Sequence, residues 1–260
     1  MTGSAKALTA RWLRLVLLAA IGVNLALICF RVLLYTPVLS QRGGVWFVLA
    51  PVVLLLVYAG IVLVVTVDPT PQRNLALRVG LAVGLLTGAM WIVDLAIETF
   101  AAASRSASLI ATAPLLLGAF ALWGAAAGYG ARRTGSLGSG VLTSVWAAVI
   151  CVLLTVTFGF LLTYTSMPTL QHDLVSDPDF LRSRWSDLRA FAIANTFGSG
   201  FSHLLGAPIV ATLVGIIGSV VGLSFGHPPV HGFEDLGAQV FRIGFHAPMM
   251  QPAQLHRNPL

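Results

Sequence analysis

The chain has 260 residues, of which 57% are hydrophobic and only 9% are charged, and its mean hydropathy is +0.89. A soluble domain is about one quarter charged, so this composition excludes an ordinary soluble protein and leaves no room for a separate soluble catalytic domain. The net charge of +6 is scattered in small groups near the predicted helix ends. That pattern indicates membrane topology and not nucleic-acid binding.

Six apolar runs reach the roughly 20 residues that a helix needs to cross a hydrocarbon core of about 30 Å. We therefore predict an all-α integral membrane bundle with spans at 12–34, 45–67, 75–100, 109–129, 141–164 and 190–223. Arg31, near the end of the first span, is expected to extend its guanidinium to the membrane surface. Residues 1–223 form the transmembrane domain, and residues 224–260 form a polar tail containing five prolines and four histidines.

The segment before the last span predicts an additional, interfacial helix. Asp177 is a good N-cap and Pro178 suits the first helical position. Over 178–189 the apolar residues share one side of the helix, and Trp185 is expected to anchor it at the membrane surface. The last span is too long for one straight crossing at 1.5 Å per residue, so we predict a kink at Pro208.

Topology follows from the distribution of Arg and Lys. Nine basic residues fall on the side that holds both termini, against six on the other side. Because cytoplasmic segments collect positive charge, we predict a multi-pass protein of a bacterial-type cytoplasmic membrane with both termini in the cytoplasm. The end of the third span and the start of the sixth then share the opposite side.

Two acids in the third span are the main candidates for a functional site. Asp94 and Glu98 are four residues apart and lie on one helical face, together with Gly80, Gly84 and Gly88. They are interpreted either as a proton- or cation-binding pair in the protein interior or as structural residues. In the second reading Glu98 lies among the headgroups and Asp94 pairs with an arginine or a backbone donor.

A polar stripe opens the sixth span, formed by Asn195, Ser199, Ser202 and His203. It predicts a solvated crevice, a ligand site or hydrogen bonds between helices. His203 is a weak candidate ligand for a metal or a tetrapyrrole, the alternative being a hydrogen-bonded structural histidine. No second histidine is available in the other spans, and we predict no bound cofactor or metal.

The remaining signals concern helix packing. Glycines spaced by four allow helices to approach closely, and they recur at Gly124 and Gly128 and at Gly218 and Gly222. The sequence contains none of the short motifs that mark nucleotide, zinc, serine-hydrolase or redox chemistry.

Three functions remain open. The first is a non-catalytic subunit or assembly factor of a larger membrane complex, consistent with the glycine-rich faces and the tail. The second is a small proton- or cation-coupled transporter or channel that uses Asp94 and Glu98. The third is a membrane-embedded enzyme with an outward-facing carboxylate and histidine site. The expected partners are the lipid bilayer and either other membrane subunits or further copies of the chain.

Overall fold

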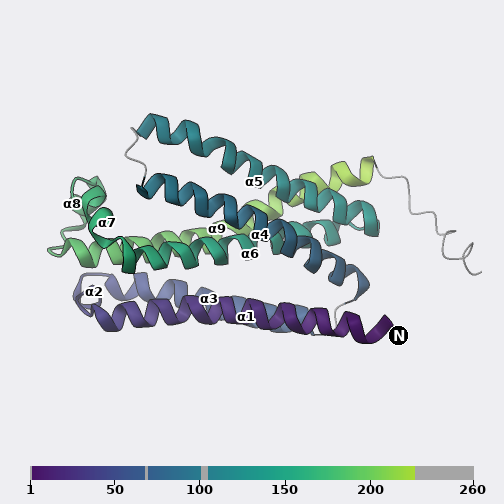
Figure 1. Cartoon of the computed structure of the whole chain (residues 1–260), viewed down its shortest axis with the longest axis horizontal. Helices are drawn as coiled ribbons and strands as arrows, with labels where there is room; N and C mark the ends of the chain where they lie inside the picture. Colours follow the sequence, from purple (N-terminus) through teal and green to yellow (C-terminus); the bar gives the residue numbers. More distant parts are fainter. Residues whose placement is uncertain (1, 68–69, 101–104, 226–260) are drawn as a thin grey trace, which may run out of the picture. The chain divides into compact units, whose positions relative to one another are not determined.

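The computed structural model describes residues 2–67, 70–100 and 105–225, and these ranges contain helices and short connections but no strand (Figure 1). The helices are α1 (Thr2–Leu34), α2 (Pro37–Ser40), α3 (Gly44–Thr66), α4 (Pro71–Phe100), α5 (Arg105–Thr134), α6 (Leu137–Thr165), α7 (Met167–Leu174), α8 (Pro178–Ser183) and α9 (Leu188–Ser224). Six of them, α1, α3, α4, α5, α6 and α9, are long and apolar enough to cross a membrane. The predicted all-helical class with six potential membrane spans is therefore confirmed. Nearly all of the predicted tail falls outside the described residues.

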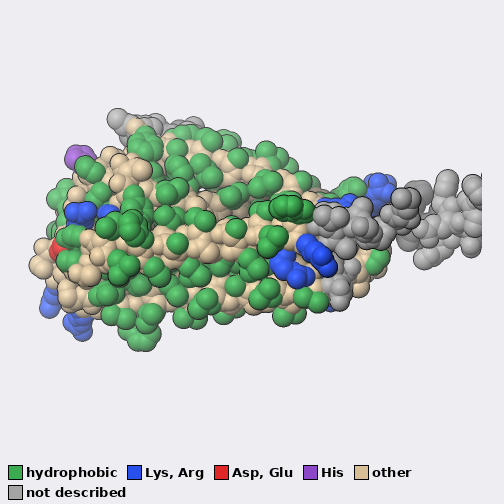
Figure 2. Space-filling model, turned by 60° about the horizontal axis from the view of Figure 1, so that its bottom comes forward, with side chains coloured by type: hydrophobic (Ala, Val, Ile, Leu, Met, Phe, Trp, Pro, Cys, Tyr) green, Lys and Arg blue, Asp and Glu red, His purple; other side chains and the backbone are tan. Residues whose placement is uncertain are grey.

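Helix α6 occupies the centre of the bundle. It packs against α1, α4, α5 and α9, and 67% of its most apolar stretch is buried, compared with 22–28% for the other five long helices. Those five expose broad apolar faces, as contact with lipid requires. On the face seen in Figure 2, hydrophobic side chains cover the middle of the molecule, and Lys and Arg gather toward its ends.

Glycines bring neighbouring helices of this chain into close contact. A Cβ at Gly84 of α4 would lie 2.7 Å from the carbonyl oxygen of Ala147 in α6. In the same way, a Cβ at Gly218 of α9 would collide with the carbonyl oxygen of Gly124 in α5. Gly80 and Gly88 of α4 also face α6, and Gly128 of α5 and Gly222 of α9 face each other.

Polar side chains add specific bonds between the helices. The Asn24 amide of α1 donates to the Thr157 hydroxyl (2.8 Å) and the Leu153 carbonyl (3.3 Å), both in α6. The Trp123 indole of α5 donates to the Thr87 hydroxyl of α4 at 3.2 Å. Such bonds fix the rotation of each helix, because an unpaired polar group in hydrocarbon is costly.

The segment between α6 and α9 differs from the prediction. A single amphipathic helix over 178–189 was expected, but α8 ends at Ser183 and Arg184 adopts a left-handed conformation with φ of 60°. Asp187 then caps α9 by accepting a bond from the amide of Ala190. Trp185 is only 8% exposed and packs against Phe47 and Phe191. The predicted helix is therefore interrupted at Arg184, and the Trp185 indole lies in the protein core.

Pro208 lies within α9 and leaves one backbone carbonyl without its helical donor. A proline has no N–H, so the carbonyl of Leu204, four residues earlier, is released. The Tyr58 hydroxyl of α3 donates a hydrogen bond to this carbonyl, and Tyr58 itself is buried. The proline is therefore accommodated by a side chain from a neighbouring helix, as membrane helices require.

Replacing Tyr58 by phenylalanine is expected to lower the free energy of unfolding by about 1–3 kcal/mol, because the Leu204 carbonyl loses the hydrogen bond from the Tyr58 hydroxyl in a buried position. Denaturant unfolding in micelles, followed by tryptophan fluorescence, measures the change. Tyr129→Phe is the matched control, since Tyr129 is 45% exposed. Equal stability of the two variants would show that the Tyr58 bond contributes nothing.

Candidate functional site

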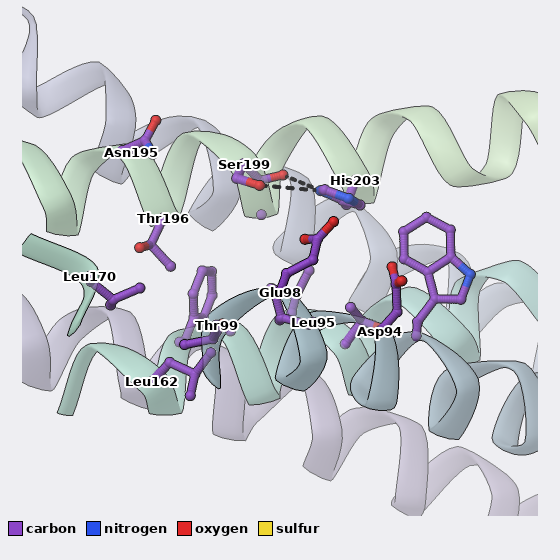
Figure 3. Close-up of a pocket in the computed structure, with 16 residues that line it drawn as sticks. Asp94, Leu95, Glu98, Thr99, Leu162, Leu170, Asn195, Thr196, Ser199 and His203 are labelled. Atoms are coloured by element: carbon purple, nitrogen blue, oxygen red, sulfur yellow. Dashed lines mark hydrogen bonds between the residues drawn. The ribbon is translucent and has the colours of Figure 1, made fainter. Parts of the chain in front are cut away.

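A cavity of about 220 Å³ lies between α4 and α9, above α6 (Figure 3). Both outer helices pack extensively against α6 but hardly contact each other, which leaves the space between them open. Leu170 of α7 lines the cavity as well. The remaining lining residues are Trp91, Asp94, Leu95, Glu98, Thr99, Thr155, Val156, Gly159, Phe160, Leu162, Asn195, Thr196, Ser199, Gly200 and His203.

The two predicted acids both line this cavity. Asp94 is half-buried, and its Oδ1 atom is buried with no hydrogen-bond partner. Glu98, one turn nearer the helix end, is exposed. In Figure 3 both carboxylates extend from α4 toward α9. Among the described side chains, no arginine forms an ion pair with either acid; the ion pair found there joins Arg182 to Asp179.

His203 reaches the same cavity from α9. Its Nδ1 atom lies 2.8 Å from the Ser199 carbonyl oxygen. Because a carbonyl only accepts, Nδ1 is the donor in this contact. The ring meets Trp91 of α4 edge to face, with centroids 5.5 Å apart. This contact joins the α4 and α9 sides of the cavity. Among the described residues, the buried indole Nε1 of Trp91 has no hydrogen-bond partner.

The predicted polar stripe is divided between two spaces. Asn195 and Ser199 line both the cavity and a second groove of about 460 Å³ between α3 and α9. Ser202 lines only that second groove, where Trp46 and Phe47 form the opposite wall. Asn195, Ser199 and Ser202 are all exposed. The structure thus unites Asp94, Glu98, Asn195, Ser199 and His203 and leaves Ser202 outside.

Several residues that line the cavity were not predicted from the sequence. Thr155 belongs to α6, and its hydroxyl is occupied by a 3.0 Å bond to the Cys151 carbonyl. Leu170 lies on α7, whose start at Ser166 and Pro168 was not recognised in the sequence. The described part of the chain holds no group of three His, Cys, Asp or Glu residues arranged to bind a metal ion. His203 therefore has no set of co-ligands there.

No protein-family model matches this chain, and no curated protein or solved structure is significantly similar to it. The chemistry of the cavity must therefore be inferred from its own residues.

Proposed function

We propose that this chain binds a proton or a monovalent cation between α4 and α9 and carries it across the membrane, alone or as an oligomer. One observation carries the proposal. A single cavity is lined by two carboxylates from α4 and by a histidine, a serine and an asparagine from α9. Ionisable side chains within a membrane helix are costly, and they commonly mark ion pathways and proton relays.

The ligand class follows from the groups present. Carboxylate, hydroxyl and amide oxygens suit hard cations, and neutral imidazole next to carboxylates suits proton exchange. A divalent metal would need more ligands than the described side chains gather around one point. The half-buried Asp94 is the binding group, and the exposed Glu98 attracts the ion to the cavity.

A non-catalytic subunit of a larger membrane complex is the second candidate. The glycine-rich helix faces give this function less support than the sequence alone did, because these glycines pack against helices of the same chain. A different observation favours it: Asn195, Ser199 and Ser202 are exposed on α9, next to the groove that α3 forms. Polar side chains that face lipid are unfavourable, and a helix from another chain would cover them.

Flux into vesicles tests the proposal. Purified protein is reconstituted with an encapsulated pH-sensitive dye, and a potassium diffusion potential, negative inside, is imposed. Proton entry that scales with the amount of protein is expected, or sodium entry in a parallel assay with a sodium-sensitive dye. Flux equal to that of protein-free vesicles for both ions would contradict transport. Association with a different membrane protein after gentle extraction would then support the subunit.

A further inference from the structure

A second polar cluster lies where α1 and α6 end and α9 begins, and it centres on Arg31. The guanidinium was expected to extend outward to the membrane surface, but Arg31 is only 4% exposed and is packed among protein side chains. Its guanidinium carbon lies 5.1 Å from the centre of the Tyr164 ring of α6. The Tyr164 hydroxyl in turn donates to the Leu27 carbonyl of α1. The aromatic ring on the neighbouring helix thus holds the cation inside the bundle.

The buried guanidinium retains unused donors. The Nε and Nη2 atoms of Arg31 are buried and have no hydrogen-bond partner among the residues that the structure describes. A buried charge of this kind is expensive unless it is paired and hydrogen-bonded. Among the described side chains, no carboxylate forms an ion pair with Arg31; the ion pair at this end joins Arg182 to Asp179.

A second guanidinium lies at the same end of the bundle. Arg189, in the first turn of α9, places its guanidinium carbon 4.5 Å from the centre of the Tyr35 ring. Tyr35 is one helical turn beyond Arg31, and its amide donates to the Arg31 carbonyl at 3.0 Å. Arg189 is exposed, whereas Arg31 is buried. One cation is therefore accessible from outside, and the other lies within.

The carboxylate of Asp187, two residues before Arg189, already accepts two hydrogen bonds. One oxygen of Asp187 accepts from the Ala190 amide at 3.0 Å, and the other accepts from the Tyr35 hydroxyl at 2.6 Å. This hydroxyl bond is the main reason that the pKa of Tyr35 is raised, so Tyr35 stays neutral and remains a donor. Asp187 therefore serves as the N-cap of α9 and as the partner of Tyr35, and among the described residues it forms no ion pair with either arginine.

We propose that Arg31 and Arg189 form a binding site for a phosphate oxyanion, supplied by the headgroup of a membrane phospholipid. Guanidinium groups bind phosphate through paired, charge-assisted hydrogen bonds. Arg31 lies in the last turn of α1 and Arg189 in the first turn of α9. This is the level at which a transmembrane helix meets the headgroups. Inorganic phosphate shares the same chemistry and is the alternative source.

Native mass spectrometry can detect the bound lipid. The full chain in detergent is titrated with dioleoyl phosphatidylglycerol and, separately, with dioleoylglycerol, which has the same acyl chains but no phosphate. The wild type is expected to retain phosphatidylglycerol more tightly than dioleoylglycerol. Arg189→Ala should raise the apparent Kd for phosphatidylglycerol about tenfold, and Arg31→Ala by at least as much, because each substitution removes charge-assisted hydrogen bonds.

Matched variants separate the site from general charge effects. Arg182→Ala removes a highly exposed arginine at the same end of the bundle and should leave the Kd unchanged. Arg189→Ala decides the question even if Arg31→Ala fails to fold, since Arg189 is exposed. Binding of inorganic phosphate without lipid, lost in Arg189→Ala, would retain the oxyanion site but assign it a soluble ligand. The proposal would be overturned if Arg189→Ala retained phosphatidylglycerol as tightly as Arg182→Ala does and the wild type bound no inorganic phosphate.

Discussion

Replacing Asp94 by asparagine is expected to abolish proton or cation flux in reconstituted vesicles, with a loss of about 100-fold or more, while the protein still folds in the membrane. Asparagine has nearly the same shape but can neither release a proton nor carry the negative charge that attracts a cation. Loss of a positioned proton-transfer group commonly reduces a rate by about 10²–10⁴-fold. The buried Oδ1 of Asp94 has no hydrogen-bond partner to lose, so a small effect on stability is expected.

Glu98→Gln should reduce flux less, by about tenfold, because Glu98 is exposed whereas Asp94 is half-buried. The charge of Glu98 attracts cations to the cavity without binding them in a buried position. Asp179→Asn is the matched control, since Asp179 is highly exposed and pairs with Arg182 outside the cavity. Full flux in Asp94→Asn, at the level of Asp179→Asn, would remove Asp94 from the pathway.

The fold class was accessible from the sequence because the bilayer imposes it. A hydrocarbon core of fixed thickness and the need to pair every backbone group restrict spanning segments to long apolar helices. Part of the site followed from the same constraints. Spacing placed Asp94 and Glu98 on one helical face, and the alternation of spans placed that face at the same end as Asn195 and His203.

The hydrophobic periodicity of the sequence could not predict which helices pack together. Helix α6 lies at the centre, and α4 and α9 flank it with a cavity between them. This arrangement depends on which helix packs against the glycines of each neighbour. Arg31 shows the same limit at a single residue. Its distance from the helix end favours a membrane-surface position, but the Tyr164 ring that holds it belongs to α6, far along the chain. Local sequence contains no information about that partner.

Gly218→Ala is expected to destabilise the fold by about 3 kcal/mol, through the contact between α5 and α9. The added Cβ would collide with the backbone of Gly124, including its carbonyl oxygen, and a backbone cannot move aside as a flexible side chain can. The two helices must therefore separate, losing contacts along their length. Overpacking of this kind commonly costs about 1–3 kcal/mol, and a backbone collision belongs at the upper end.

Gly206→Ala provides the control within the same helix, because a Cβ at Gly206 would meet no atom within 4 Å. Alanine is the better helix former by about 0.5–1 kcal/mol, so this variant should be as stable as the wild type or slightly more so. Unfolding in mixed micelles of increasing denaturing-detergent content measures both variants. Opposite signs for the two substitutions would show that close approach of the α5 and α9 backbones, and not helix propensity, determines the need for glycine at position 218. Equal stability would mean that the α5 backbone can yield at no cost, and that the glycines between α5 and α9 do not hold this pair together.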